Sequence, residues 1–243
     1  MMRKRTAIVT GAARRVGAAI VRSLLMDGWD VVAHVHHGND DVPEGSVKVV
    51  ADLADPGCAA IIFEALGGLP PVRLLVNNAA RFSFDSLTQF SPAEFDQHMA
   101  VNVRAPALLI DRLASEEDAS GSLIVNLLDS KLFAPNPDFL SYTLSKYALA
   151  ALTEVAARAL GERAIRVNGI APALTLRSNG QSEENFRAMH SSNPLRRGVD
   201  PKDIIAALRY LIDAEAVTGQ VLGIDSGQRF MGFARDVQFL GNP

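Results

Sequence analysis

Short apolar runs alternate with longer amphipathic segments along the whole chain. The runs have the length of β-strands, and most of the segments between them place apolar residues at helical spacing. The expected strands are Thr6–Thr10, Asp30–Val35, Val47–Ala51, Arg73–Val76, Ser122–Leu127, Arg166–Ile170 and Val221–Ile224, and the expected helices are Val16–Met26, Cys58–Leu66, Ser91–Leu113, Tyr142–Leu160 and Pro201–Ile212. Strands joined by helical crossovers form parallel sheets with helices on both faces. We therefore predict an α/β fold in which residues 1–243 form one domain around a single doubly wound, seven-stranded parallel sheet.

Composition narrows the kind of protein to which this sheet belongs. Of 243 residues 48% are apolar, and 24 Lys and Arg residues stand against 27 Asp and Glu residues, for a net charge of −3. This charge, without a basic block, argues against nucleic acid as a partner. The single cysteine, Cys58, excludes an internal disulfide framework and a multi-cysteine metal site, and we expect no bound metal. No apolar run has the length of a membrane span or of a signal-peptide core, so we expect a cytoplasmic protein without a membrane partner.

One long connection stands apart from this regular alternation. Ala173–Asn193 is rich in Ser, Asn and charged residues, and it lies between an expected strand and an expected helix. A long irregular connection in a compact domain is usually functional, so we expect a substrate loop or lid at about residues 173–193. The alternative is a disordered surface insertion.

A turn with two glycines follows the first expected strand. In Thr10–Gly17, Gly11 allows the tight turn, and the start of the next helix presents unpaired N–H groups to a pyrophosphate. The predicted phosphate-binding residues are Gly11, Arg14, Arg15, Val16 and Gly17. The alternative is a purely structural strand-to-helix turn.

The end of the second expected strand indicates which dinucleotide is bound. Sites that prefer NAD carry a carboxylate there for the ribose 2′-hydroxyl, but this chain has His36 and His37 and no acid before Asp40. Arg14, Arg15 and His37 are suited to pair with a 2′-phosphate, which predicts NADP(H). The alternative is a surface histidine cluster without a ligand.

Asp52 ends the third expected strand, where a carboxylate can accept a hydrogen bond from the adenine amino group. An aspartate that stabilises a turn is the alternative at this position.

Tyr142 and Lys146 are spaced to share one helix face. Residues at i and i+4 are neighbours on a helix, and a lysine ammonium beside a phenol favours tyrosinate and lowers the phenol pKa. We therefore expect Tyr142 to donate a proton near neutral pH and Lys146 also to hold ribose hydroxyls. The pair gains weight from the glycine turn and from Asn77-Asn78-Ala79, which follows the fourth expected strand.

Over essentially its whole length the chain resembles the short-chain dehydrogenase/reductase family. The matching pieces are Thr10-Gly11…Gly17, Asn77-Asn78-Ala79-Ala80, Asn102, Tyr142…Lys146, Arg166-Val167-Asn168 with Pro172, and Val217–Gly227, in which Ser226 replaces the usual glycine. The resemblance implies a Rossmann-like fold, hydride transfer with a nicotinamide cofactor, and a homotetramer built on the Ser91–Leu113 and Tyr142–Leu160 helices and the last strand. It assigns acid/base chemistry to Tyr142, its support to Lys146 and a proton-relay water to Asn102. The further cofactor contacts that it implies are Asp52, Leu53, Asn78, Ala79, Lys146, Pro172 and Thr175.

The position 13 residues before Tyr142, where the family usually has serine, is Asp129. An ionised carboxylate cannot donate to a ketone oxygen, but a carboxyl group suits a nitrogen heterocycle with a C=N bond. The sequence resembles the pteridine reductase branch, which carries aspartate here. That resemblance implies substrate contacts at Arg15, Phe82, Asp129 and Tyr142, although Ala80 and His37 replace the branch's serine and arginine. Alternatives are that Ser130 does the work of the serine one residue later, and that Phe82 only packs its loop.

The leading hypothesis is an NADPH-dependent oxidoreductase that transfers hydride to a pteridine-like substrate, such as a dihydropterin or dihydrofolate, or to a related C=N compound. The alternative within enzymes is a reductase of a ketone or quinone. The alternative of another class is a non-catalytic dinucleotide-binding redox sensor, against which the intact Tyr142–Lys146 pair argues.

Overall fold

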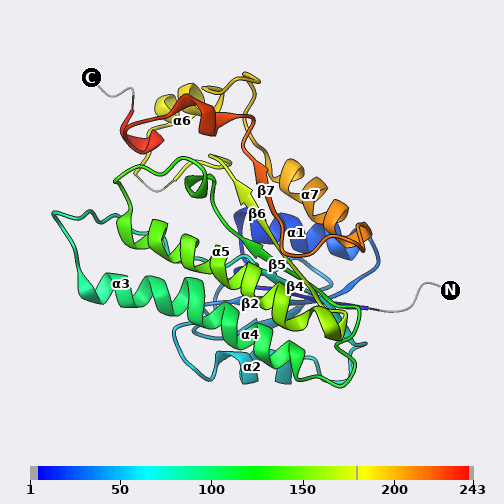
Figure 1. Ribbon diagram of the computed structural model, residues 1–243. Coiled ribbons are helices and arrows are strands. Elements are labelled where there is room, and N and C mark those ends of the chain that lie inside the picture. The colour runs from blue at the N-terminus through cyan, green and yellow to red at the C-terminus, as the bar shows by residue number, and fades with distance from the viewer. Residues whose placement is uncertain (1–4, 179, 241–243) are drawn as a thin grey trace.

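The protein is built around one twisted sheet (Figure 1). The computed structural model describes residues 5–178 and 180–240. Seven strands pair in parallel throughout, in the order β3-β2-β1-β4-β5-β6-β7. Their bounds are Thr6–Val9, Asp30–Val35, Val47–Val50, Val72–Asn77, Leu123–Leu127, Arg166–Pro172 and Val221–Ile224 for β1 to β7. The predicted doubly wound fold is confirmed.

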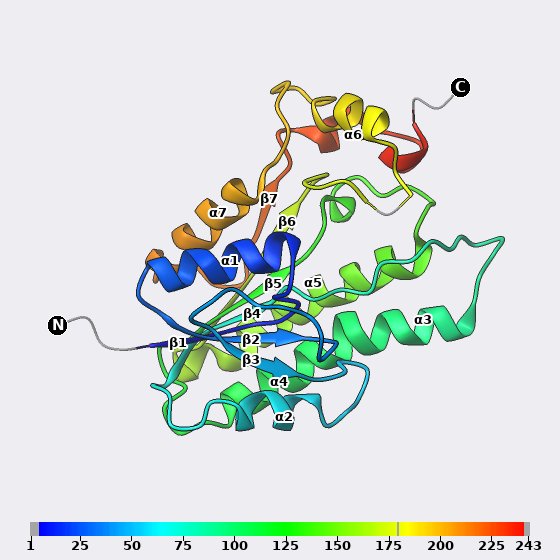
Figure 2. The same ribbon diagram turned by 180° about the vertical axis from the view of Figure 1, so that it is seen from behind.

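Helices cover both faces of the sheet (Figures 1 and 2). On one face lie α2 (Cys58–Glu64), α4 (Ala105–Ala114) and α5 (Leu140–Leu160), and on the other α1 (Arg15–Met26) and α7 (Pro201–Asp213). Each face has its own apolar core, because the inner strands are buried on both sides. Within the described part of the chain, no helix is long and apolar enough to span a membrane.

The helix expected over Ser91–Leu113 is interrupted. It consists of α3 (Pro92–Met99), a π-helical stretch Ala100–Arg104, and α4. Pro106 follows closely and has no N–H, so the carbonyl of Asn102 has no α-helical donor four residues on. Such π-helical turns occur frequently at functional sites. The expectation of one continuous helix is therefore wrong, and the break falls at Asn102.

The segment after β6 is more ordered than expected. Residues 183–190 form helix α6 (Glu183–His190), which begins where the Ser182 hydroxyl accepts the Asn185 N–H at 3.1 Å. The expectation of an irregular connection over Ala173–Asn193 is wrong for this part. In Figure 1, α6 (yellow) and the C-terminal segment (red) lie together beyond the ends of β6 and β7.

Candidate active site

The turn between β1 and α1 is shaped by close backbone packing. Gly11 has φ of 65°, and a Cβ there would lie 2.9 Å from the Ala79 Cα. A Cβ on Gly17 would lie 2.1 Å from the Gly11 carbonyl oxygen, so position 17 has no room for a side chain. The first turn of α1 has no side-chain cap and no acidic residue, which leaves its N–H groups available to an anion.

Asn78 and Thr10 join this turn to the end of β4. The Asn78 amide donates to the carbonyl oxygens of Thr10 at 2.8 Å and Gly11 at 3.1 Å. The Thr10 hydroxyl accepts the N–H groups of Asn78 and Ala79, both at 3.0 Å. Asn78 and Ala79, predicted as cofactor contacts, thus lie directly against the predicted phosphate turn.

His34, which the motif analysis did not select, holds the same turn from β2. Its Nδ1 accepts the Gly11 N–H at 3.3 Å, and its Nε2 lies 3.1 Å from the Ala51 carbonyl oxygen, to which it donates. The ring is therefore neutral, and burial lowers the pKa of His34. The signal in the sequence was a polar side chain inside a run that is otherwise buried.

Arg15 lies in the predicted phosphate turn and reaches a second segment of the chain. Its guanidinium donates to the carbonyl oxygens of Arg177 at 2.7 Å and Leu176 at 3.1 Å, so it connects the phosphate turn to the segment after β6. The exposed rings of His36 and His37 stack with centroids 4.2 Å apart. The pairing of Arg15 and His37 with a 2′-phosphate stays a prediction.

The remaining predicted cofactor positions lie along the same edge of the sheet. Asp52 accepts the Ala54 N–H at 2.8 Å, the turn bond that was the alternative to an adenine contact. Pro172 ends β6, and the Thr175 hydroxyl donates to the Ala173 carbonyl at 2.9 Å. The other positions are exposed Arg14, half-buried Val16 and buried Leu53.

Tyr142, Asp129 and Lys146 meet at the carboxyl end of β5. The Tyr142 hydroxyl donates to Asp129 Oδ2 at 2.8 Å, and Asp129 Oδ1 accepts the Lys131 N–H at 2.8 Å. Lys146 Nζ donates to the Leu127 carbonyl oxygen at 2.6 Å and lies 5.5 Å from the centroid of the Tyr142 ring. The hydrogen-bond partner of the Tyr142 hydroxyl is thus Asp129, and not Ser130, which was the alternative.

The electrostatics of this cluster reverse one sequence expectation. Burial, and then the Asp129 carboxylate, raise the pKa of Tyr142 well above its ordinary value. Burial also raises the pKa of Asp129, and it lowers the pKa of Lys146 to about 8. The expected lowering of the phenol pKa by Lys146 is therefore wrong for this arrangement, because desolvation and a nearby negative charge outweigh the ammonium.

Asn102 connects the π-helical stretch to the catalytic helix. Its Oδ1 accepts the Arg81 N–H at 2.7 Å, and its Nδ2 donates to the Arg81 carbonyl at 3.0 Å and to Ser145 Oγ at 2.9 Å. The Asn102 amide is thus held by the Arg81 backbone and by Ser145, which lies three residues after Tyr142 and directly before Lys146 on α5. The proton-relay water that the family resemblance assigns to Asn102 stays a prediction.

An aromatic ring stands beside the reactive phenol. Phe82 meets the Tyr142 ring edge to face at a centroid distance of 4.7 Å and is 43% exposed. The neighbouring Arg81 forms a bidentate ion pair with Glu94, from Nη2 to Oε1 at 2.7 Å and from Nε to Oε2 at 3.1 Å, so its charge is balanced. Phe82 therefore offers apolar surface beside Tyr142 without a free cation next to it.

Three further residues support the site and lie outside the motifs. Asp85 accepts the Ser141 N–H at 2.9 Å and the Ser141 hydroxyl, and so caps the start of α5. Lys131 and Asp236 form an ion pair next to Asp129. No local pattern identifies these residues, because each contact depends on segments that are distant in sequence.

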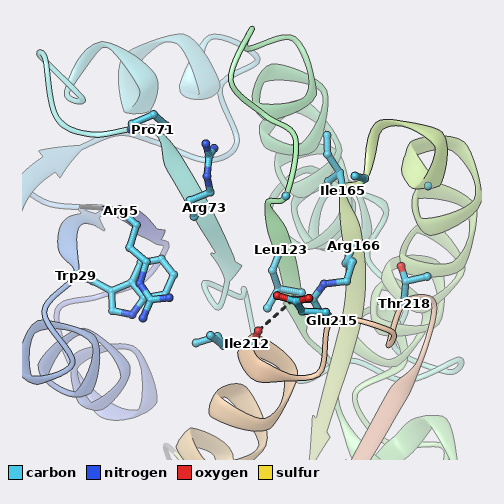
Figure 3. Close-up of a pocket in the computed structure, with 13 residues that line it drawn as sticks. Arg5, Trp29, Pro71, Arg73, Leu123, Ile165, Arg166, Ile212, Glu215 and Thr218 are labelled. Carbon is cyan, nitrogen blue, oxygen red and sulfur yellow. Dashed lines mark hydrogen bonds between the residues drawn. The ribbon is translucent and has the colours of Figure 1, made fainter. Parts of the chain in front are cut away.

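A cavity of about 1050 Å³ lies at the opposite, amino-terminal edge of the sheet (Figure 3). Its arginines are used structurally: Arg5 stacks over Trp29 at 3.9 Å, and Arg166 donates to carbonyl oxygens at the end of α7, among them that of Leu211 at 2.8 Å. Arg73 likewise donates to the carbonyls of Val72 and Asp118. The cavity contains none of the predicted site residues.

Comparisons with known proteins agree on the class that the fold and site define. The family model described as enoyl-(acyl carrier protein) reductase matches residues 11–229. Carbonyl reductase [NADPH] 2 of Sus scrofa is 30% identical over 91% of this chain and 95% of the relative, and L-xylulose reductase of Bos taurus is 31% identical over 92% and 96%. FolM alternative dihydrofolate reductase 1 from Brucella suis, in complex with NADP, is 35% identical with a TM-score of 0.88, over 95% of this chain and 97% of that one.

These matches show that the protein is an NAD(P)-dependent oxidoreductase. The chain belongs to the short-chain dehydrogenase/reductase family, as its motifs indicated. The predicted enzyme class and the predicted type of cofactor are confirmed.

Proposed function

We propose that this protein reduces a pteridine-like or related C=N substrate with NADPH. The observation that carries the proposal is the hydrogen bond from Tyr142 to Asp129, which puts a carboxyl group where carbonyl reduction calls for a neutral donor. A carboxyl can accept from an exocyclic amino group and a ring N–H of a heterocycle at the same time. The similarity to the FolM dihydrofolate reductases of Brucella supports the same substrate class.

The residues at the phosphate turn fit NADP(H). Gly11 and Gly17 let the turn pack closely on itself and on Asn78 and Ala79, and the uncapped start of α1 suits a pyrophosphate. Arg14, His36 and His37 remain the candidates for the 2′-phosphate. The carboxylates beside them are Asp52, whose Oδ1 lies 3.8 Å from His36 Nε2, and Asp40, whose Oδ2 accepts the His37 N–H at 3.2 Å. The FolM structures from Brucella, both with NADP, support this choice.

Each residue of the cluster has a role in this reaction. The nicotinamide, when bound, supplies the hydride. Asp129 orients the heterocycle and Tyr142 delivers the proton, while the Lys146 ammonium holds the ribose and stabilises the negative charge left on the phenolate. Phe82 supports one face of the ring system, and Arg15 extends from the start of α1 to the segment after β6.

The proposal is tested by following NADPH consumption with dihydrobiopterin, dihydrofolate, L-xylulose and a quinone. We expect turnover of at least one of the two pterins and none with Tyr142→Phe. Turnover of the sugar or quinone alone would contradict the proposal. It would favour the second candidate, ketone or quinone reduction, which the carbonyl reductase and xylulose reductase relatives support.

The remaining sequence predictions stay proposals. We propose that residues 173–193 act as a lid, that the chain is one domain, and that it works in the cytoplasm without nucleic acid or membrane partners. For the homotetramer, α5 presents exposed apolar side chains at helical spacing, Leu144, Tyr147 and Val155. Light scattering on the purified chain tests the tetramer, and a monomer would contradict it.

A further inference from the structure

The C-terminal segment, residues 233–240, packs against the loop that leads into the catalytic helix. This loop, residues 131–139, joins Asp129 at the end of β5 to α5, which carries Tyr142. The Asn185 amide of α6 donates to the Leu240 carbonyl, so the segment also contacts the region proposed as a lid. Figure 1 shows the segment in red beside α6.

A buried ion pair holds the segment to the loop. Lys131 Nζ lies 2.7 Å from Asp236 Oδ2, with the two side chains 9% and 12% exposed. The same ammonium donates to Asn136 Oδ1 at 2.8 Å, and the backbone N–H of Lys131 binds Asp129. A buried pair gains little net stability after desolvation, so its main effect is to impose one geometry.

A second set of contacts repeats this attachment. Asp138 is buried, and its carboxylate accepts the Asp236 N–H at 2.8 Å and Arg235 Nε at 2.8 Å. Two ion pairs therefore join the segment to the loop: in Lys131–Asp236 the loop carries the positive charge, and in Arg235–Asp138 the segment carries it. A shift of the segment along the loop would separate these pairs, so the charges favour one register.

The segment also completes an aromatic stack that ends at the active site. Phe239 stacks on Phe139 at a centroid distance of 5.9 Å and an interplanar angle of 13°. Phe139 stacks on Phe82 at 4.3 Å and 18°, and Phe82 meets the edge of Tyr142. The rings of Phe239, Phe139 and Phe82 thus form a continuous row of contacts that ends at the Tyr142 ring.

Phe139 is the strained member of this stack. It is 3% exposed, and its φ of 57° is in the left-handed region that side chains rarely adopt. It occupies the position immediately before α5, where its carbonyl accepts the Thr143 N–H at 2.9 Å. A strained residue persists only where its surroundings hold it, and Phe82 and Phe239 provide that support.

We infer that residues 233–240 are a positioning element of the active site, in which Asp236 and Phe239 set the orientation of Phe82 and the start of α5 for a flat ring substrate. Phe239 acts through Phe139, and Asp236 acts through Lys131. The substrate class rests on the proposed function, whereas the positioning of α5 does not.

The first test compares Phe239→Ala and Asp236→Asn with Phe230→Ala as a matched control, since Phe230 is 72% exposed. With dihydrobiopterin, we expect KM to rise by about fivefold to tenfold in Phe239→Ala, which loses a ring contact, and in Asp236→Asn, which loses a charge contact. We expect kcat and the dissociation constant for NADPH to change little, and all three to be unchanged in Phe230→Ala. Equal KM in all variants would overturn the inference.

The second test separates positioning from loss of folding. Removal of one ion-pair partner leaves a buried charge alone, whereas removal of both does not. We therefore expect Lys131→Met to lower the Tm and raise KM, and the double variant Lys131→Met/Asp236→Leu to recover the Tm while its KM stays raised. A double variant with normal KM would overturn the positioning role of the pair.

The third test does not depend on the substrate. Amide hydrogen exchange of residues 139–146 should be faster in Phe239→Ala and Asp236→Asn than in the wild type and Phe230→Ala. If exchange accelerates but no pterin is turned over, the proposed function fails and the positioning element stands. If pterin is turned over and exchange does not change, the positioning element fails.

Discussion

The Tyr142 hydroxyl donates its hydrogen bond to the carboxylate of Asp129, at 2.8 Å, inside a buried cluster. Burial raises the pKa values of both Asp129 and Tyr142, the two groups joined by this proton. A substrate that enters must therefore offer a hydrogen-bond donor to Asp129 when it takes the Tyr142 proton. A ketone oxygen has none, and a heterocycle with amino and ring N–H groups does.

Tyr142→Phe removes the proton donor and leaves the rest of the ring in place. We expect kcat for the pterin to fall by about 10²-fold to 10⁴-fold, the contribution of general acid catalysis. Binding of NADPH, measured by fluorescence titration, should be unchanged, because the cofactor contacts lie on other residues. A variant that keeps near-normal turnover would show that the proton comes from elsewhere.

Asp129→Ser restores the side chain that the family usually carries at this position. We expect kcat/KM to fall for the pterin and to rise for a small ketone, each by about tenfold or more, since a hydroxyl can donate to a ketone oxygen. Asp129→Asn is the comparison, because it preserves size and removes the charge. If both variants lose activity on both substrates equally, Asp129 does not select the substrate.

The pKa of Lys146, about 8, predicts the alkaline side of the pH profile. The ammonium is present below that value and is lost above it. In the proposed mechanism the ammonium holds the ribose and supports the phenol, so kcat/KM should decline as pH rises through about 8. Lys146→Arg, which stays charged, should lose this decline if it remains active at all; a decline at the same pH in that variant would assign it to another group.

The same desolvation makes Lys146 costly to the fold. Its pKa is about 8 in the folded chain against 10.5 for an ordinary lysine, so at neutral pH the burial of the ammonium opposes folding. Lys146→Met keeps the volume, and we expect it to raise the free energy of unfolding at pH 7 by on the order of 1–3 kcal/mol while it abolishes turnover. Urea unfolding checks this, and a loss of stability would contradict it.

Local spacing explains which parts of the structure were predictable. The sheet follows from apolar runs, and the Tyr142–Lys146 pair follows from the i and i+4 positions of one helix. The π-helical stretch had a local signal in the sequence, because Pro106 lacks a backbone N–H. The pattern of apolar residues, from which the helix was predicted, does not contain this signal. Helix α6 is short and polar, so its apolar pattern was too weak to separate it from a loop.

Long-range contacts explain the rest. The raised pKa of Tyr142 comes from burial and from Asp129, neither of which a helix repeat contains. The pairing of Lys131 with Asp236 joins two distant segments, and charged residues in loops are ordinarily exposed. No motif selected His34, because its role depends on the Gly11 and Ala51 backbone on either side of β2.

His34 makes the stability of the protein depend on pH in a defined range. Burial lowers its pKa below the ordinary 6.5, so between that value and the folded-state pKa the unfolded chain binds a proton that the folded chain does not. The free energy of unfolding should therefore fall as pH drops below about 6.5, and His34→Asn should remove this part of the slope. His36→Asn, at an exposed position on the same segment, should retain it.

His34→Asn should also weaken NADP(H) binding by about fivefold, because the Gly11 N–H loses its acceptor. Chemical unfolding at several pH values, with and without NADP(H), measures both effects, and an identical slope in the two variants would show that His34 does not titrate as this geometry requires.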